Sequence, residues 1–461
     1  MVTSLTRPVL LLGAVGCTAL AARLALLFVA PTPVPDTDGY FGVAALWLHG
    51  PESPDAVPVG TFRTPGYALV VLPFEPLPGD WHHAVVIAQH GLGVAIAVAV
   101  AALAVRWFGL AAGAIAGVVA ATAPLMVATE RLLTPDVAFA AAVLAATAVL
   151  VEAVRRESPA HRMLALAGLG YGLAAYLKPV AQCFLLAGLV PLAVTTRNLR
   201  ATAVGSGVLA LAMAATLLPW IARNALVYER PVMSSITGLN LYLRVFDVNG
   251  RPLPDTEEGR RLAAVERALR ARADDGEPLA FRVGNDLARR GMDPDEAREL
   301  QGRVALTAIL DAPLAHLRST VAGIADFADY VHELSDADAR PIADELPRSE
   351  AWGARGLALR IWQAGSAAGS LWWLLSLHGL LALALLVWGR REERATIAAL
   401  GWAWLLLASA TSVSSPVFDG FPRLPAQGAP LLWIGCSGAL AAAAAALPAA
   451  LRDRRPDRPG A

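Results

Sequence analysis

Long apolar runs separated by short polar loops dominate the chain. An α-helix needs about 20 apolar residues to cross a hydrocarbon layer of about 30 Å. The pattern predicts ten such spans, at about residues 9–30, 82–105, 109–128, 134–154, 163–177, 179–196, 201–221, 362–388, 395–413 and 425–447. We therefore predict an all-α polytopic membrane protein with about ten transmembrane helices.

The junction between two of these spans is unusually tight. Lys178-Pro179 stands between the fifth and sixth runs with almost no polar loop around it. Proline is favoured at the first position of a helix, where its missing N–H would be unsatisfied anyway. The sequence thus predicts one helix ending before Lys178 and the next beginning at Pro179, both at the same membrane face.

Two segments interrupt the pattern of spans. Residues 31–80 form a polar, proline-rich loop in which residues 41–48 are a candidate interfacial helix. Within that loop, residues 65–74 are apolar but too short to cross a bilayer, which is typical of a re-entrant or interfacial piece. We expect this first loop to lie on the extracytoplasmic side.

The second interruption is a long polar segment, residues 223–360. It has mixed charge and helical periodicity, for example at residues 257–273 and 293–310. Asp293-Pro294-Asp295-Glu296 is typical of a helix start, with an N-cap, proline at the first position and acids in the first turn. We predict a mainly helical extracytoplasmic domain here, between transmembrane modules at residues 1–222 and 361–461, the second ending in a basic cytoplasmic tail.

The arginines predict the orientation. One alternate set of loops carries an excess of arginine, a feature typical of the cytoplasmic side of membrane proteins. With ten spans, both terminal segments fall on the same side as these loops. The arginines on this side are Arg7, Arg106, Arg155, Arg156, Arg162, Arg197, Arg200, Arg390, Arg391, Arg394, Arg452, Arg454 and Arg455. We expect both termini in the cytoplasm.

Composition narrows the functional classes. The chain is 56% hydrophobic and 16% charged, its mean hydropathy is +0.52, and its net charge of zero suggests no nucleic-acid partner. Cys17, Cys183 and Cys436 all lie in apolar runs, which argues against a disulfide framework. No phosphate-binding glycine loop is present, which argues against a nucleotide-sugar enzyme at the cytoplasmic face. The richness in alanine and arginine suggests a GC-rich bacterium and its plasma membrane.

Five polar clusters fall on the predicted extracytoplasmic side. They are Asp36/Asp38, Arg63 before the short apolar piece, Glu130-Arg131 with Asp136, the single lysine Lys178, and Arg423. Ionisable groups at a membrane are costly and indicate function by default. Cations there neutralise a phosphate, while a carboxylate takes a proton from an attacking hydroxyl. Plainer alternatives remain, such as an interfacial Glu130–Arg131 ion pair, snorkelling arginines at 63 and 423, and histidines that only pack.

Several motifs resemble those of one superfamily. The first-loop sequence Asp36-Thr-Asp-Gly-Tyr40 resembles the signature of the GT-C glycosyltransferases, relatives of protein O-mannosyltransferases and lipid A aminoarabinose transferases. Further similar motifs follow in the same order: Arg63-Thr-Pro-Gly-Tyr67, Leu133-Thr-Pro-Asp136, Leu177-Lys178-Pro179, Pro219-Trp220-x-x-Arg223-Asn224, Gly238-Leu-Asn240-Leu-Tyr242 and Arg423-Leu-Pro425. Asp-Thr in the first loop and the shortened Arg-Leu-Pro motif depart from the family pattern. Donor and acceptor identity are therefore left open.

The resemblance implies a reaction and a set of roles. It implies transfer of a sugar, with inversion at the anomeric carbon, from a polyprenyl-phosphate donor to a hydroxyl of a glycan, lipid or protein acceptor. Asp36 would be the general base, because the family's catalytic aspartate stands four residues before an aromatic. Asp136 or Asp38 would orient the acceptor or, if a metal such as Mg²⁺ or Mn²⁺ is used, Asp36 and Asp136 would hold it. The donor phosphate would meet Lys178, Arg63, Arg423 and Arg223. Substrate-binding candidates are Tyr40, Tyr67, Glu130, Asn240 and Tyr242.

Two other functions stay open. A transporter or flippase of a lipid-linked or anionic substrate would use the same cations. It would also be expected to show inverted repeats and polar residues near mid-membrane, whereas no convincing internal repeat is present and the charges gather at one face. The other alternative is a catalytically inactive GT-C relative.

Overall fold

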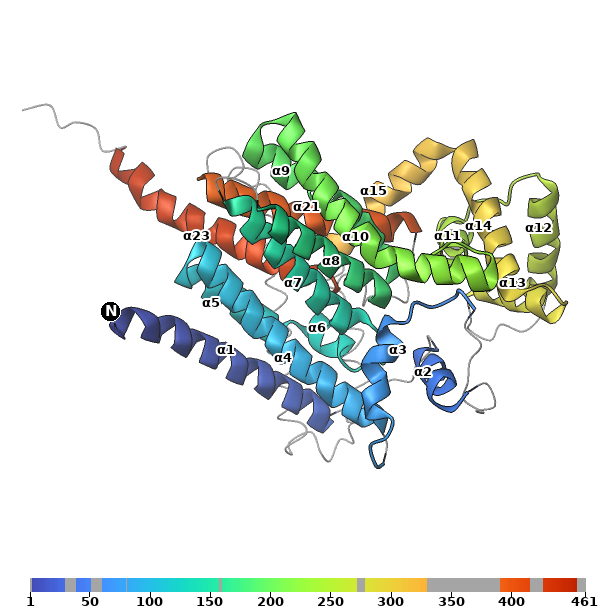
Figure 1. Cartoon of the computed structure of the whole chain (residues 1–461), viewed down its shortest axis with the longest axis horizontal. Helices are drawn as coiled ribbons and strands as arrows, with labels where there is room; N and C mark the ends of the chain where they lie inside the picture. Colours follow the sequence, from blue (N-terminus) through green and yellow to red (C-terminus); the bar gives the residue numbers. More distant parts are fainter. Residues whose placement is uncertain are drawn as a thin grey trace, which may run out of the picture.

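A computed structural model of the chain describes residues 2–29, 39–50, 60–79, 81–156, 160–271, 278–329, 390–414 and 426–453. Over these ranges the regular structure is helical. Figure 1 shows a bundle of long helices lying side by side, with a group of shorter helices at one end of the bundle.

The bundle contains most of the predicted spans. Its elements are α1 (Val2–Val29), α4 (Trp81–Phe108), α5 (Leu110–Thr122), α6 (Pro124–Thr129), α7 (Asp136–Arg155), α8 (His161–Leu177), η2 (Pro179–Leu186), α9 (Leu189–Thr196), α10 (Leu199–Tyr228), α21 (Arg391–Ser414) and α23 (Ala429–Asp453). Six described helical segments are long and apolar enough to cross a membrane. The chain is thus a multi-pass membrane protein, and its predicted span at residues 362–388 falls outside the described ranges.

Several predicted spans differ in detail from the observed helices; the run at 179–196, for example, contains η2 and α9. The run at 109–128 is divided into α5 and α6, because Ala123 leaves the helical conformation before Pro124. The last helix before the polar segment, α10, continues to Tyr228 rather than ending near residue 221. At Lys178 the prediction is confirmed, since α8 ends at Leu177, Lys178 is extended, and η2 begins with Pro179 at its first position.

Small residues let helices of the bundle approach closely. A Cβ on Gly168 would lie 2.2 Å from the carbonyl oxygen of Leu209, and one on Gly172 would lie 2.5 Å from the Thr216 side chain. Small residues at helix contacts are typical of membrane proteins, where close backbone approach replaces the hydrophobic driving force. Helices α8 and α10 pack together in this way.

The first loop forms short helices at the end of the bundle. They are α2 (Tyr40–His49), α3 (Gly66–Val71) and η1 (Leu72–Phe74). The helix predicted at 41–48 is therefore present, and the short apolar piece at 65–74 contains helices too short to span a bilayer. Both elements lie beside the same end of α4 in Figure 1.

The polar segment forms a helical domain. Its elements are α11 (Ile236–Tyr242), the π-helix η3 (Leu243–Val248), α12 (Glu257–Arg270), α13 (Leu279–Arg289), α14 (Pro294–Asp311) and α15 (Pro313–Asp329). Residues such as Leu262, Val283 and Leu300 form a core of its own. The predicted cap is confirmed, because the Asp293 side chain accepts hydrogen bonds from the amides of Asp295 and Glu296. Residues 330–360 of the predicted domain lie outside the described ranges.

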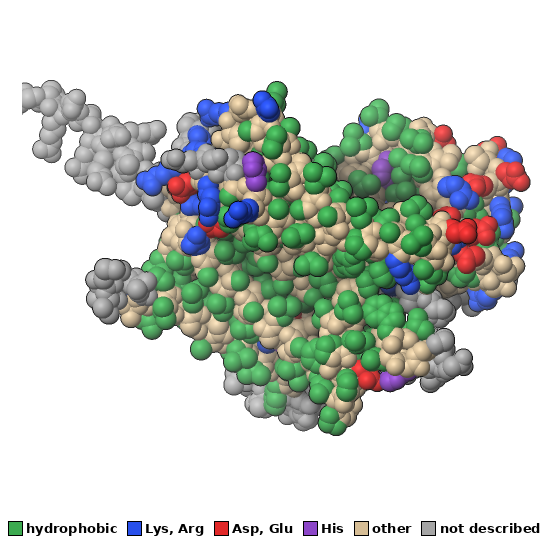
Figure 2. Space-filling view, in the orientation of Figure 1, with side chains coloured by type: hydrophobic (Ala, Val, Ile, Leu, Met, Phe, Trp, Pro, Cys, Tyr) green, Lys and Arg blue, Asp and Glu red, His purple; other side chains and the backbone are tan. Residues whose placement is uncertain are grey.

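The two ends of the molecule carry different charge patterns. Figure 2 shows hydrophobic side chains over much of the bundle, Lys and Arg gathered at the end away from the helical domain, and mixed charges on that domain. At the arginine-rich end, Arg106 pairs with Glu152 at 2.7 Å and Arg155 pairs with Glu392 at 2.8 Å. These pairs join the ends of α4, α7 and α21.

Candidate active site

A cavity of about 600 Å³ lies where the first loop, the α8–η2 junction, the helical domain and α21 meet. Four residues singled out from the sequence line it, namely Tyr40, Arg63, Lys178 and Asn240. Val180, Phe281, Leu406 and Val413 contribute apolar wall, and Gln182, Thr237 and Gln427 contribute polar groups. The formally charged residues among the described lining, Arg63 and Lys178, are both cations.

Lys178 is held in place by a buried carboxylate. Its Nζ donates a hydrogen bond to Asp136 Oδ1 at 2.7 Å, and Gln427 Nε2 donates to the same oxygen at 2.6 Å. The Asp136 side chain is 1% exposed, whereas that of Lys178 is 16% exposed and lines the cavity. The extended backbone at Lys178 between two helices puts the ammonium at this point.

The segment that carries Arg63 is fitted tightly against the α8–η2 junction. A Cβ on Gly66 would lie 2.5 Å from the carbonyl carbon of Tyr176, so only glycine permits this approach. Thr64 Oγ1 adds a hydrogen bond of 3.4 Å to the carbonyl oxygen of Leu177. Since Lys178 follows Leu177 directly, this packing brings Arg63 and Lys178 to the same cavity.

Aromatic rings support Arg63 from the side of the bundle. The Tyr40 and Tyr67 rings meet edge to face with centroids 5.3 Å apart, and Arg63 Cζ lies 5.1 Å from the Tyr40 centroid. Tyr67 is buried, and its hydroxyl donates to Gln89 Oε1 at 3.0 Å. Gln89 Nε2 in turn donates to the carbonyl oxygens of Glu130 at 3.0 Å and Leu132 at 2.8 Å. Tyr67 thus supports the cavity wall without lining it.

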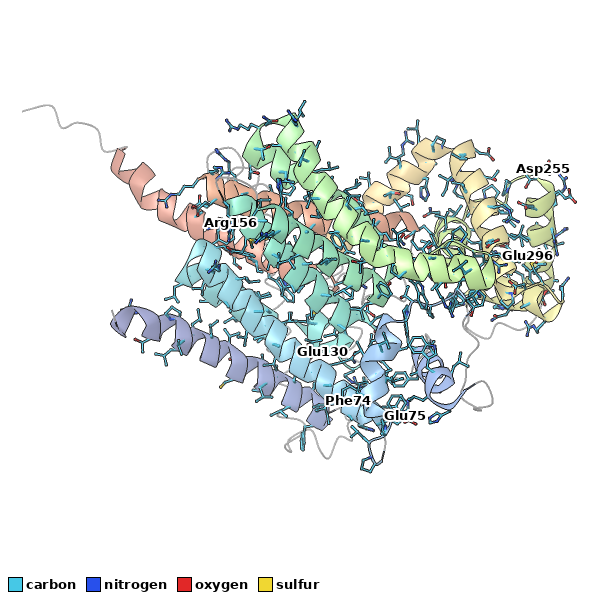
Figure 3. The ribbon with its side chains drawn as sticks, in the orientation of Figure 1. Phe74, Glu75, Glu130, Arg156, Asp255 and Glu296 are labelled. Atoms are coloured by element: carbon cyan, nitrogen blue, oxygen red, sulfur yellow. The ribbon has the colours of Figure 1, made fainter. Side chains whose placement is uncertain are left out.

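Glu130, a predicted substrate-binding residue, lies inside the bundle instead of at the cavity. Figure 3 shows it between α6 and α4. Its side chain is 0% exposed, with Oε1 2.6 Å from an Arg23 guanidinium nitrogen and Oε2 2.7 Å from His90 Nδ1. Arg23 comes from α1 and His90 from α4. This placement gives Glu130 a structural role between three elements.

Two more predicted residues lie away from the cavity. The Tyr242 hydroxyl donates to Glu266 Oε1 at 2.7 Å inside the helical domain, where burial raises the pKa of Tyr242. The Arg223 guanidinium carbon lies 4.8 Å from the ring centroids of both Trp220 and Tyr228. Neither side chain lines the cavity.

Part of the predicted site falls outside the described residues, namely Asp36, Asp38 and Arg423. In the part of the chain that the structure describes, no group of three or more His, Cys, Asp or Glu side chains could hold a metal ion. A metal held by Asp36 and Asp136 therefore stays a prediction.

Three buried polar residues with hydrogen-bond partners in the structure were not singled out from the sequence. Gln427 and Gln89 are buried amides that bond to Asp136 and Tyr67, respectively. Arg23 is the one cation in the first apolar run, and a charged residue within a predicted span could have indicated a buried partner. The amides carried no comparable signal, because their partners are distant in sequence.

Comparisons with known proteins agree with the motifs. Residues 63–220 match the family model described as dolichyl-phosphate-mannose-protein mannosyltransferase. A search of curated proteins found no match. Among solved structures, ArnT from Cupriavidus metallidurans bound to undecaprenyl phosphate is similar at 15% identity and a TM-score of 0.36, over 98% of this chain and 81% of that one.

A second similar structure is the archaeal oligosaccharyltransferase AglB from Archaeoglobus fulgidus. Its identity is 15% and its TM-score 0.33, over 88% of this chain and 56% of that one. Both structural likenesses are weak, so the similarity to a family rests on the sequence match. That match begins at Arg63, contains the Asp136 and Lys178 motifs and ends at Trp220. Residues 63–220, about a third of the chain, are thus similar to the dolichyl-phosphate-mannose-protein mannosyltransferase family.

Proposed function

We propose that the protein transfers a sugar from a polyprenyl-phosphate-linked donor to the hydroxyl of an extracytoplasmic acceptor, with inversion at the anomeric carbon. The observation that carries this proposal is the cavity in which Arg63 and Lys178, far apart in sequence, lie beside Tyr40. The family match supports it, because both cations fall within or at the edge of the matched residues.

The two cations suit the donor phosphate. Arginine binds phosphate oxygens in a bidentate manner, and lysine acts as a point charge on them. Negative charge grows on the phosphate as the bond to the sugar breaks, so fixed cations stabilise the transition state more than the bound donor. Asp136 sets the position of Lys178 through their 2.7 Å contact. In this proposal Asp136 therefore acts through Lys178, and other groups bind the acceptor.

Asp36 is the proposed general base. It stands four residues before Tyr40, which lines the cavity. The acceptor oxygen forms a bond to the anomeric carbon while the bond from that carbon to the phosphate oxygen breaks. Polyprenyl phosphate leaves with the electron pair, and the acceptor proton passes to Asp36.

The apolar wall suits the lipid part of the donor. Val180, Leu406 and Val413 line the cavity next to the bundle, so a polyprenyl chain can leave the phosphate toward the membrane. We place the cavity on the extracytoplasmic side of a bacterial plasma membrane, with both termini in the cytoplasm. Asn240 lines the side formed by the helical domain and is a candidate contact to the sugar or the acceptor.

The test uses purified protein in detergent with a panel of radiolabelled polyprenyl-phosphate sugars and candidate acceptors. Wild type is expected to release polyprenyl phosphate or to label an acceptor. Asp36→Asn should bind the same donor but lose turnover by at least about 10²-fold, the usual contribution of a general base. Donor binding by both proteins without turnover on any acceptor would instead favour a transporter or an inactive relative.

A further inference from the structure

The loop just before Arg63 is fastened to the helical domain by its backbone. The amide of Ser235 donates to the carbonyl oxygen of Thr61 at 2.9 Å, and the Ser234 hydroxyl donates to the carbonyl oxygen of Phe62. The amide of Thr61 donates to Asp295 Oδ2 at 3.2 Å. Residues on both sides of the Thr61–Phe62 peptide are thereby bonded to a domain about 170 residues or more away in sequence.

Asp295, at the start of α14, is the centre of this attachment. Its side chain is buried, and Oδ1 accepts hydrogen bonds from the Ser235 hydroxyl at 2.7 Å and from the Arg298 guanidinium. Burial alone would raise the pKa of Asp295, but the bonds from Ser235 and Arg298 hold that pKa below its ordinary value. Asp295 is therefore a carboxylate at neutral pH, with both oxygens used as acceptors.

The fit around this carboxylate is close. A Cβ on Gly60 would lie 2.7 Å from Asp295 Oδ2, and Gly60 has a φ of +52°. The left-handed backbone region and the lack of space both favour glycine there. The loop therefore turns directly over the carboxylate before it reaches Arg63.

One aromatic ring connects this attachment to the cavity. The Phe62 centroid lies 4.3 Å from Arg63 Cζ and 4.6 Å from Arg298 Cζ. Two guanidinium groups near one ring repel each other unless one is neutralised. Asp295 neutralises Arg298, so Arg63 can remain on Phe62 and reach the cavity that it lines.

We propose that Asp295 is a positioning residue that fixes Arg63 for binding of the donor phosphate, and so makes the helical domain part of the phosphate site. The inference rests on the proposed function only for the identity of the anion. The attachment of residues 60–62 to Asp295 does not depend on it. The first test is therefore a measurement that needs no substrate.

Asp295→Asn is the informative change. Asparagine keeps the size of the side chain but has one acceptor oxygen where Asp295 uses two, so either Thr61 or the Ser235–Arg298 pair loses its bond. Hydrogen–deuterium exchange of peptides covering residues 60–68 should be faster in this variant than in wild type. Glu296→Gln is the matched control, because Glu296 is exposed on the same turn of α14 and labelled in Figure 3. It should leave exchange in these peptides unchanged.

The second test measures affinity for polyprenyl phosphate, the proposed leaving group, without turnover. Asp295→Asn should weaken this Kd about tenfold, the size expected for loss of one charge-assisted hydrogen bond. With an active donor, KM should rise and kcat should fall, because a displaced Arg63 stabilises both the bound donor and the transition state less. Thermal unfolding of each variant shows that it is folded, and Ser235→Ala provides a milder second variant that retains the carboxylate.

A double-mutant cycle tests whether the effect passes through Arg63. Arg63→Gln should weaken polyprenyl-phosphate binding by itself, and adding Asp295→Asn should then change the Kd little. Additive effects of the two changes, or unchanged exchange in residues 60–68, would overturn the positioning role. Failure of the wild type to bind any polyprenyl phosphate would instead count against the proposed function, while the exchange result would still decide the attachment.

Discussion

Arg23, Glu130 and His90 form a buried ionic cluster that joins α1, α4 and α6. Each side chain is at most 5% exposed. Removing one partner of a buried ion pair leaves an uncompensated charge, and the cost is typically about 3–5 kcal/mol. We expect Glu130→Gln to lower the free energy of unfolding by about 3 kcal/mol, measured by denaturant titration in detergent. Its affinity for polyprenyl phosphate should stay near wild type, because Glu130 does not line the cavity.

Glu152 provides the control for this prediction. It pairs with Arg106, whose side chain is 64% exposed, at the arginine-rich end of the bundle. Exposed ion pairs contribute little, so Glu152→Gln should change stability much less than Glu130→Gln. A large loss of donor affinity in Glu130→Gln with unchanged stability would contradict the structural role and support the predicted substrate contact.

At the scale of single residues, motifs in the sequence predicted which residues line the cavity better than they predicted which side chains contact each other. Tyr40, Arg63, Lys178 and Asn240 were singled out from motifs, and the fold brings them to one cavity. Glu130 belonged to the same kind of motif yet pairs with Arg23, a residue 107 positions away. Such pairings depend on which helices become neighbours, and helix periodicity alone does not determine this.

The contact between α3 and α8 is the element-scale feature on which the cavity depends. The Cβ of an alanine at 66 would lie 2.5 Å from the Tyr176 carbonyl carbon and 2.8 Å from the Leu177 amide nitrogen. Both neighbours are backbone atoms, so α3 must move. We expect Gly66→Ala to weaken polyprenyl-phosphate binding by at least about tenfold, since displacements of about 1 Å can cost as much as 10²-fold.

Gly91→Ala is the control for that change. Apart from its chain neighbours and the backbone of its own helix, no atom lies within 4 Å of the position of its Cβ on α4, and alanine is the better helix former. Unfolding and polyprenyl-phosphate titrations should give wild-type values for this variant or a slight stabilisation. Equal affinities for all three proteins would show that the close approach at Gly66 does not matter for the cavity.

The π-helix η3 is joined to α13 by a carboxylate with an unusual pKa. Asp247 Oδ2 accepts a hydrogen bond of 2.8 Å from the Ala280 amide, at the start of α13. Burial raises the pKa of Asp247 from 3.8 to about 6. Between these two values the folded state binds more protons than the unfolded state, so this group makes the protein less stable as pH rises from about 4 to about 6.

Asp247→Asn should remove that dependence. The asparagine carbonyl can still accept from Ala280, and no buried charge remains. We expect the variant to be more stable than wild type above pH 6, by about 1–2 kcal/mol after allowance for solvent screening, and equally stable near pH 4. Thermal melts of both proteins at several pH values provide the measurement, and parallel pH profiles would contradict the assignment.

Helix boundaries were predicted correctly from the sequence where a capping residue or a proline determines them. Asp293 caps α14 and Pro179 begins η2, because capping and proline geometry act within a few residues. The end of α10 was predicted about seven residues too early, because the prediction followed hydropathy and the last turns of this helix are polar. These turns are bonded to the segment that follows, since Asn224 Nδ2 donates to the carbonyl oxygen of Val232 at 2.8 Å.

At the scale of the whole molecule, the helical domain lies at one end of the helix bundle (Figure 1). Helix α10 has 30 residues, which corresponds to about 45 Å, whereas the hydrocarbon layer is about 30 Å thick. Since its last turns lead into the helical domain (Figure 1), we expect them to extend past the hydrocarbon. The cavity lies between this domain and the bundle, where the proposed function would bring a lipid-linked donor and a water-soluble acceptor together.

The arginine distribution predicts which face this is. Arg106, Arg155 and Arg156 lie at the bundle end opposite the helical domain, where Arg156 is labelled in Figure 3. Arginine-rich loops stay in the cytoplasm, so fusions truncated after Arg155 should be fluorescent with green fluorescent protein and inactive with alkaline phosphatase. Fusions truncated after Tyr228 should show the reverse. The opposite pattern at both points would put the cavity in the cytoplasm, where a water-soluble acceptor would have to be cytoplasmic as well, and the proposed extracytoplasmic transfer would be excluded.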